Sequence, residues 1–498
     1  MDPILYWNEV SLEANRVSHT DGKDVGTLGP TLSSRALAIV HLAMYDAYAG
    51  VSNDPTNLPP YLDLSSLPPP APGASADAAV AAAAHATLSK LFPSQKPFFD
   101  LKHLQAGLGG SGLNEGHQFG LLVAQKLLED RKDDPNASDD GYAASVARGA
   151  HRPDPDNPDQ GYHAPFYGSQ SKGFAITARH ELAAPPFGNP EYRKALREVR
   201  GKGIAPELMG TLPKVPEDIK ARTVDETLVG IFWAYDGASG IGTPPRLYNQ
   251  IVRRVAEARN NSVVDNARLF AFVNVAMADA GILAWDQKYI HDLWRPVVGI
   301  REHDKSMGPA ATQANNNISE NCDTSWLPLG APNSNRLAKN FTPNFPAYPS
   351  GHATFGAAAF HITRLFYNQG GKFSNNTLDK DTLFNGLDFV SDEFNGVTTD
   401  NKGAVRPRHL RNFADGGLWQ MIEENGRSRV DLGVHWVFDA FVVKDDGTPD
   451  LARRDAAGKP FGGVPLGLLI AEDIFQAGGG KAPKRSTEVV PRFQLGRA

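Results

Sequence analysis

The 498-residue chain is poor in sulfur, with a single cysteine, Cys322, and only six methionines. A lone cysteine cannot close an internal disulfide and cannot build a cysteine-rich metal centre, so both kinds of stabilisation are excluded. A scarcity of oxidisable side chains suits a protein exposed to a strong oxidant, and ordinary compositional drift explains it equally well. The cysteine count therefore excludes a fold held by disulfides or by a cysteine-rich metal centre, and it does not indicate the cellular compartment.

The chain also lacks a strong charge excess and a continuous apolar run. Its formal net charge of -6 gives no reason to expect nucleic acid or an anionic membrane as a partner. The most apolar segment, 269–285, is interrupted by Asn274 and Asp279 and is typical of a buried helix. Residues 1–7 have no basic region and no apolar core, so we expect no classical secretory signal there. We predict a soluble protein whose export route and oligomeric state are open, with a monomer as the simplest expectation.

Helical periodicity dominates the rest of the sequence. Asp2 is placed to cap a first helix that begins at Pro3. Further helices are expected over about 34–48, 77–92, 121–129, 224–235, 245–260, 266–294, 351–368, 383–394, 410–425 and 434–442. Few stretches alternate with a period of two, so the predicted class is all-α with at most minor strands. A change of composition near 212–222 suggests a division into 1–215 and 216–498.

Long loops rich in Asp, Asn and Pro cover 130–160 and 301–349. A loop of this length inside a large domain usually covers a surface or borders a site. His151, His163 and His180 lie in or after the first loop, without the spacing of metal ligands. Surface or helix-capping roles are therefore favoured for these three histidines.

The segment 345–352 reads Phe-Pro-Ala-Tyr-Pro-Ser-Gly-His and leads into an apolar helix that Gly370 and Gly371 are expected to end. Ser350 is a good N-cap, and Gly351 lets a ligand approach the backbone closely. Ser350, Gly351 and His352 are therefore expected on the first turn, where free N–H groups and the helix dipole favour an oxyanion. Taken alone, such a segment is more often a cap with an incidental histidine.

Cationic residues lie in two further blocks. Lys288 and Arg295 are seven residues apart, which predicts that they share one face of a helix. Arg429 precedes His435 by six residues, with Gly433 available to turn the chain between them. Three cations offer more donors than one carboxylate can accept, whereas a tetrahedral oxyanion such as phosphate or vanadate can accept them all.

The three blocks, Lys-x6-Arg-Pro, Pro-Ser-Gly-His and Ser-Arg-x5-His, together resemble the superfamily of the vanadium-dependent haloperoxidases and the type 2 phosphatidic acid phosphatases. Every central residue is present and in order: Lys288, Arg295, Ser350, Gly351, His352, Arg429 and His435. The surroundings resemble the fungal-type vanadium chloroperoxidases more closely, because Phe345 opens the second block and Trp285 lies three residues before Lys288. The resemblance extends over most of the chain.

This resemblance implies two four-helix bundles with long connecting loops, and vanadate, in which vanadium is V, as the cofactor. It implies that the oxyanion is held by Lys288, Arg295, Ser350, Gly351, Arg429 and His435. Within that set His435 is expected to ligate the metal, and Lys288 to polarise bound peroxide. His352 is expected to be the general acid–base. Hydrogen peroxide, a halide ion and small organic acceptors are the expected reactants.

Four further residues are expected to support this site. Asp439 lies one helical turn after His435, where it can accept the other ring N–H, although a surface pair has the same spacing. The resemblance implies that Asp236 pairs with Arg429, and a structural aspartate in a turn is the competing interpretation. It also implies that Trp285 and Phe345 border the halide and favour chloride, whereas simple core aromatics would be commonplace.

Three functions are compatible with these residues. The leading hypothesis is a chloroperoxidase that also oxidises bromide and iodide. The second is a soluble acid phosphatase that uses the same oxyanion pocket, with His435 forming a phospho-histidine. The third is a catalytically silent helical protein that retains the pocket as an anion-stabilised core. The aromatic residues Phe345 and Trp285 favour the peroxidase over the phosphatase.

Overall fold

The computed structural model describes residues 2–214, 216–314, 317–368 and 384–492. Its helices are α1 (Pro3–Asp21), α2 (Gly29–Ser52), α3 (Ala76–Leu91), α4 (Lys96–Gln105), α5 (Leu113–Asp130), α6 (Tyr167–Gln170), α7 (Pro190–Lys202), α8 (Val224–Phe232), α9 (Pro244–Ala258), α10 (Val263–His291), α11 (Pro296–Arg301), α12 (Gly351–Tyr367), α13 (Leu418–Asp431), α14 (Val437–Ala440) and α15 (Gly463–Ala477). The strands, β1 (Leu387–Phe389) and β2 (Arg411–Phe413), pair antiparallel. The expectation of a helical fold with at most minor strands is confirmed.

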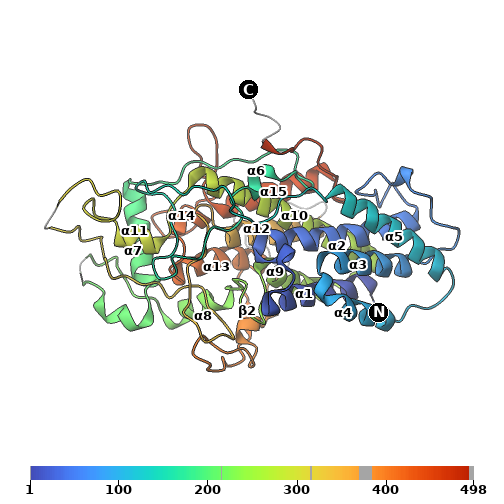
Figure 1. The fold of residues 1–498 in the computed structure, drawn as a ribbon, viewed down its shortest axis with the longest axis horizontal. Coiled ribbons are helices and arrows are strands. Elements are labelled where there is room, and N and C mark those ends of the chain that lie inside the picture. The colour runs from blue at the N-terminus through green and yellow to red at the C-terminus, as the bar shows by residue number, and fades with distance from the viewer. Residues whose placement is uncertain (1, 215, 315–316, 369–383, 493–498) are drawn as a thin grey trace.

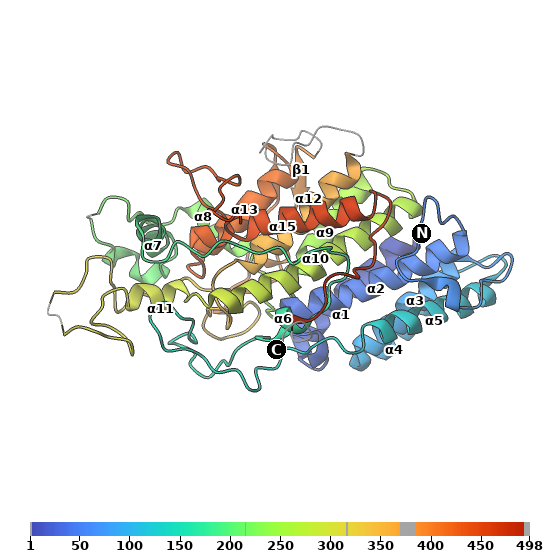
Figure 2. The ribbon, with the colours of Figure 1, turned by 90° about the horizontal axis from the view of Figure 1, so that it is seen from above.

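Helix α10 lies at the centre of the molecule (Figures 1 and 2). Ser262 begins it as an N-cap, because its side chain accepts a hydrogen bond from the N–H of Asp265. Helix α2 packs against it from the N-terminal part of the chain, and α12 and α15 pack against it from the C-terminal part. Every residue from Leu269 to Lys288 is buried, so this helix is covered by protein on all sides.

Among the described residues, α10 is the one helix long and apolar enough to cross a membrane, and 94% of its most apolar stretch is buried in the protein. This agrees with the expectation of a core helix. Asp279, which interrupts the apolar run, accepts hydrogen bonds from the backbone N–H groups of Phe174, Ala175 and Ile176. The buried carboxylate thereby attaches a long loop to the core helix.

Helix α15 fixes the start of α12, the helix that carries the Ser-Gly-His segment. The two helices pack along each other, as Figure 2 shows. A Cβ atom on Gly463 would lie 2.6 Å from the carbonyl oxygen of Ser350, and one on Gly467 would lie 2.5 Å from that of Thr354. Glycine is therefore required at both positions for this close approach.

Two helix predictions are wrong near the small sheet. The segment 384–394 forms β1 and a short 3-10 turn, Asp392–Phe394, in place of the predicted helix over 383–394, whose residue 383 lies outside the described residues. The helix predicted over 410–425 begins only at Leu418, after β2. Gly416 and Gly417, with φ angles of 137° and 51°, separate the strand from the helix. Helix α12 ends at Tyr367, and Gly370 and Gly371, which were expected to end it, lie outside the described residues.

Candidate active site

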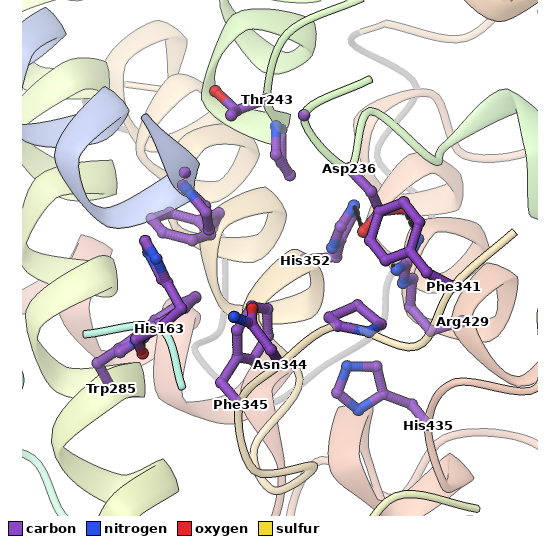
Figure 3. A pocket seen from close by; sticks show the side chains of 17 residues that line it. His163, Asp236, Thr243, Trp285, Phe341, Asn344, Phe345, His352, Arg429 and His435 are labelled. Carbon is purple, nitrogen blue, oxygen red and sulfur yellow. Dashed lines mark hydrogen bonds and ion pairs between the residues drawn. The ribbon is translucent and has the colours of Figure 1, made fainter. Parts of the chain in front are cut away.

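A cavity of about 120 Å³ lies where loops and helix ends from distant parts of the chain meet (Figure 3). Its lining residues are Gly29, Pro30, His163, Asp236, Gly237, Thr243, Pro244, Trp285, Phe341, Pro343, Asn344, Phe345, Gly351, His352, Phe355, Arg429 and His435. Figure 3 shows Trp285 and Phe345 on one side and Asp236 and Arg429 on the other. The cavity therefore has an aromatic wall and a charged wall.

The Ser-Gly-His segment begins α12 as predicted. Ser350 is the N-cap in extended backbone geometry, and its Oγ accepts a 3.4 Å hydrogen bond from the N–H of Ala353. Gly351 lines the cavity, where an added Cβ would lie 3.3 Å from the Trp285 ring. Nε2 of His352 lies 2.5 Å from the carbonyl oxygen of Ala234. This bond requires the proton on Nε2, so Nδ1 is the basic nitrogen of the neutral ring.

Arg429 and Asp236 form a buried ion pair on the charged wall. Arg429, near the end of α13, donates from Nη1 and Nη2 to the two carboxylate oxygens of Asp236, at 3.0 and 2.8 Å. Burial raises the pKa of Asp236, and Arg429 opposes that rise. The pairing expected from the resemblance is present, and it holds the guanidinium beside His352, whose Nε2 lies 3.9 Å from Asp236.

His435 and Asp439 form a second buried pair. Nδ1 of His435 lies 2.7 Å from Oδ2 of Asp439, and the same oxygen accepts the N–H of Trp436 at 3.0 Å. Burial raises the pKa of Asp439 to about 7. The pKa of His435 is lowered by burial and then by the charge of Arg295. A neutral His435 ring with its proton on Nδ1 therefore keeps its electron pair on Nε2.

Arg295 lies directly behind His435. Its Nη1 donates to the carbonyl oxygen of Val434 at 2.7 Å and lies 2.9 Å from Nε2 of His435, while its Nε donates to the carbonyl oxygen of Phe345 at 2.8 Å. Burial lowers the pKa of Arg295 to about 9. Gly433, with a φ of 74°, turns the chain between α13 and His435 as expected.

The prediction that Lys288 and Arg295 share one helical face is wrong. Helix α10 ends at His291, Asp292 takes a left-handed conformation with φ of 45°, and Arg295 is extended just before α11. Nζ of Lys288 instead donates to three backbone carbonyls, those of Pro346, Ala347 and Pro349, at 2.8, 3.2 and 2.5 Å. Both cations are fully buried, and neither is among the lining residues.

The aromatic wall is formed chiefly by Trp285 and Phe345. Their ring centroids are 4.8 Å apart, and Nζ of Lys288 lies 5.0 Å from the centre of Phe345. The guanidinium of Arg295 lies 4.9 Å from the same ring. These rings therefore shield two buried cations from water, which strengthens any electrostatic interaction at the site.

Comparison with known proteins identifies the family of the chain. Residues 1–161 match the family model described as the vanadium chloroperoxidase N-terminal domain, and residues 268–448 match the second helical-bundle domain of the same family. The chain is 35% identical to the vanadium chloroperoxidase of Curvularia inaequalis, over 95% of this chain and 90% of that protein. The chain belongs to the vanadium chloroperoxidase family. Vanadate is accordingly its cofactor, and it is a vanadium-dependent haloperoxidase.

Solved structures of haloperoxidases share the fold. A bacterial vanadium-dependent iodoperoxidase superposes with a TM-score of 0.61 at 19% identity, covering 94% of this chain and 96% of that chain. A holo-type bacterial vanadium-dependent chloroperoxidase superposes with a TM-score of 0.59 at 16% identity, covering 93% and 96% of the two chains. At these identities the likeness concerns the fold alone.

The site residues of this haloperoxidase fit vanadate. Nη2 of Arg295 and Nε of Arg429 are buried and have no hydrogen-bond partner among the described residues. A buried donor left unpaired costs about 1–3 kcal/mol, so a bound acceptor accounts for both. Lys288, Arg295 and Arg429 also outnumber the carboxylates of Asp236 and Asp439, which leaves an excess of positive charge. An oxyanion supplies both the acceptors and the missing negative charge.

Two histidines assigned to surface or capping roles are in fact buried or at the cavity. His151 is fully buried, and neither ring nitrogen has a partner among the described residues. His163 lines the aromatic wall. His180 pairs with Asp473 at 3.0 Å, away from the lining residues. His163 could not be assigned to the site from periodicity, because its loop has none. Its position next to a long polar loop is the one feature of the sequence that indicates a site there.

Proposed function

We propose that this haloperoxidase is a chloroperoxidase that oxidises chloride, bromide and iodide with hydrogen peroxide to hypohalous acid, which then reacts with small organic acceptors. Bound vanadate supplies a Lewis-acidic vanadium(V) centre that activates peroxide. The observation that carries the proposal is the pair of unpaired, buried guanidinium N–H groups of Arg295 and Arg429, of which the Arg295 guanidinium contacts Nε2 of His435. An aromatic wall lies within the same cavity.

The oxyanion is held by Arg295, Arg429, Lys288 and the start of α12 in this proposal. The unpaired Nη2 of Arg295 and Nε of Arg429 bind its oxygens, while Asp236 holds Arg429 in place through two hydrogen bonds. Ser350 and the N–H of Gly351 add neutral donors at the positive end of the helix. These groups neutralise the charge of the anion in a site from which water is excluded.

His435 ligates the metal through Nε2 in this proposal. Oδ2 of Asp439 accepts a hydrogen bond from Nδ1–H of His435 at 2.7 Å. This bond holds the proton on Nδ1 and leaves the electron pair of the ring on Nε2. In the present structure Nη1 of Arg295 lies 2.9 Å from that nitrogen. Binding therefore requires the arginine to release His435 and to turn its N–H groups toward the oxyanion.

His352 moves the proton in this proposal. Its Nε2–H donates to the carbonyl oxygen of Ala234, so Nδ1 accepts a proton from the incoming peroxide and later returns it. Oxidation of a halide by hydrogen peroxide to hypohalous acid consumes one proton and releases one water, so the reaction needs such a proton carrier. Burial, and then Arg429, lower the pKa of His352 well below its usual value, and a bound anion would offset the effect of Arg429.

In this proposal Lys288 would donate an N–H to peroxide at the oxyanion site. Its ammonium now donates to three carbonyl oxygens of the segment that precedes α12. These contacts place the charge beside the first turn of that helix, and one N–H must leave its carbonyl to reach the oxidant. Trp285 and Phe345, whose rings pack near this ammonium, border the halide and lower the local polarity, which favours chloride oxidation.

A soluble acid phosphatase is the second candidate, because phosphate and vanadate fit the same donors. In that case Nε2 of His435 attacks phosphorus and forms a phospho-histidine, while His352 protonates the leaving alcohol. Asp439, bonded to Nδ1 of His435, would support nucleophilic attack as well as metal ligation. The aromatic wall favours the peroxidase, since a phosphate ester has no need of it.

Halogenation of a cyclic diketone by the vanadate-loaded protein distinguishes the chloroperoxidase from the acid phosphatase. Peroxide is supplied with chloride or bromide, in the presence and absence of excess phosphate. Chlorination that phosphate suppresses supports the proposal. Bromination without chlorination removes the significance given to Phe345 and Trp285. Silence with both halides, together with rapid phosphate-ester hydrolysis by the vanadate-free protein, makes the phosphatase the better answer.

We also propose a two-bundle organisation with one bundle in 1–215 and the other, which carries the oxyanion site, in 216–498. The packing of α2 with α3 and α5, and of α12 with α13 and α15, supports this division. One hydrophobic core includes residues of both parts, which supports the proposal that they form one compact unit. We propose a soluble monomer that requires neither nucleic acid nor a membrane.

A further inference from the structure

The aromatic wall of the cavity carries two polar side chains, His163 and Asn344 (Figure 3). The ring of His163 packs edge-on against Trp285, with centroids 5.9 Å apart, and lies 6.1 Å from Phe345. A halide held against such rings keeps its full negative charge and still needs a hydrogen-bond donor, because burying an unpaired charge is costly. A halide on the aromatic wall therefore requires a hydrogen-bond donor from a neighbouring group.

The other donors near this wall are already engaged. The indole N–H of Trp285 donates to the carbonyl oxygen of His163 at 3.1 Å. The side-chain amide of Asn344 donates to the carbonyl oxygen of Gln160 at 3.0 Å. Lys288 donates to three carbonyls behind the rings. Asn344 keeps a second amide N–H, and the ring of His163, which packs against both Trp285 and Phe345, is the better-placed donor.

The surroundings of His163 fix its ring. Its backbone N–H donates to the carbonyl oxygen of Asn344 at 2.9 Å, and its own carbonyl also accepts the Tyr289 hydroxyl at 2.8 Å. Nε2 lies 3.1 Å from the hydroxyl oxygen of Thr31 at the start of α2. Gly29 makes room for the ring, because a Cβ there would lie 2.4 Å from Cε1.

The contact with Thr31 allows two tautomers of the ring, because the hydroxyl can either donate to Nε2 or accept from it. When the Thr31 hydroxyl donates to Nε2, the ring proton resides on Nδ1, for which no described residue provides a hydrogen-bond partner. The start of α2, where Gly29 and Pro30 line the same wall, adds the positive end of a helix dipole. An N–H and a helix start thus lie together on an otherwise apolar surface, which suits a small monovalent anion.

We propose that Nδ1–H of His163 donates to the halide ion on the aromatic wall and sets the affinity of this haloperoxidase for halide. The inference rests on the haloperoxidase function proposed above and adds a residue to it. Burial, and then the charge of His19, lower the pKa of His163 to about 4, so the ring is neutral above about pH 5. A neutral donor binds the halide without creating a cation that would attract vanadate to the wrong wall.

The test compares His163→Phe, which removes the donor and keeps an aromatic ring, with His163→Gln, which keeps an N–H donor. His180→Gln is the matched control, because His180 follows in the same region of the chain and pairs with Asp473 outside the cavity lining. Steady-state kinetics of the vanadate-loaded proteins are measured against bromide and, separately, against peroxide. Bromide-soaked crystals of the vanadate-loaded wild type and His163→Phe are examined by anomalous diffraction.

We expect His163→Phe to raise the KM for bromide about tenfold, as for the loss of one hydrogen bond to a charged group. The KM for peroxide and kcat should stay within about twofold, and His163→Gln should recover most of the bromide affinity. An anomalous peak should lie at Nδ1 of His163 in the wild type and vanish in His163→Phe.

An unchanged bromide KM in His163→Phe, or a bromide peak away from His163 in the wild type, would overturn the assignment. A wild type that binds bromide at His163 and oxidises no halide would instead refute the proposed function and leave the halide site standing. The diffraction result therefore distinguishes a failure of the proposed halide site from a failure of the proposed function.

Discussion

Replacing Asp439 by asparagine removes a buried charge while nearly preserving the shape of the side chain. Oδ2 of Asp439 accepts hydrogen bonds from Nδ1 of His435 and from the N–H of Trp436, and Oδ1 has no partner among the described residues. An asparagine oxygen can keep both bonds, but a neutral acceptor forms a bond about half as strong as an ionised one. Nε2 of His435 then becomes a poorer metal ligand.

The expected loss for Asp439→Asn is about 10–100-fold in vanadate affinity, the usual effect of removing a partner that orients a metal ligand. This corresponds to about 1.4–2.8 kcal/mol. Burial raises the pKa of Asp439 to about 7, so the carboxylate is ionised above that pH. The difference between wild type and variant should be largest near pH 8 and should shrink as the pH falls below 6.

Calorimetric titration of the vanadate-free proteins with vanadate at pH 8 and pH 5.5 measures this effect. Asp473→Asn is the matched control, because Asp473 also pairs with a histidine, His180 at 3.0 Å, and lies outside the cavity lining. The control should bind vanadate within about twofold of wild type. Wild-type affinity in Asp439→Asn at pH 8 would refute the proposed support of His435 by this carboxylate.

Substitutions of three further histidines test separate roles, two in the site and one in stability. His435→Ala should abolish tight vanadate binding in the same titration, whereas His352→Ala should retain binding and lose halogenation; full activity of both variants would contradict the site assignment. His41 is buried between Asn8 and the carbonyl oxygen of Leu37, and burial lowers its pKa to about 4. As the pH falls from about 6.5 to 4, His41 becomes protonated in the unfolded chain but stays neutral in the folded protein. The free energy of unfolding therefore falls by on the order of 2 kcal/mol over this range. In urea unfolding, the stability difference between wild type and His41→Gln should shrink over that range, and a pH-independent difference would contradict this shift.

Much of the helical fold was predictable from periodicity, and the exceptions have local causes. The long core helix α10 and the capped start of α12 follow from apolar spacing and from Ser350. Helix α15 was missed because Gly463, Pro465 and Gly467 at its start are poor helix formers, and only packing against α12 explains them. Strand β1 lies where the sequence predicts a helix, because pairing with β2, a contact distant in sequence, decides its conformation.

Motifs in the sequence located the expected oxyanion-binding residues, because these residues lie in three compact blocks. The pairs of Asp236 with Arg429 and of Asp439 with His435 were also anticipated, and both form. The turn at Asp292 was not predicted, because a single left-handed residue at the end of α10 produces no periodic pattern in the sequence. His163 was missed for a similar reason, because only the folded loop brings it to the aromatic wall.

A crystal structure of the vanadate-loaded protein would show directly whether His435 ligates the metal. We expect vanadium at bonding distance from Nε2 of His435, with oxyanion oxygens accepting hydrogen bonds from Nη2 of Arg295 and Nε of Arg429. We also expect that Nη1 of Arg295 no longer contacts His435. Vanadate bound elsewhere, or at this cavity with the contact between Arg295 and His435 intact, would contradict the assignment of His435 as the metal ligand.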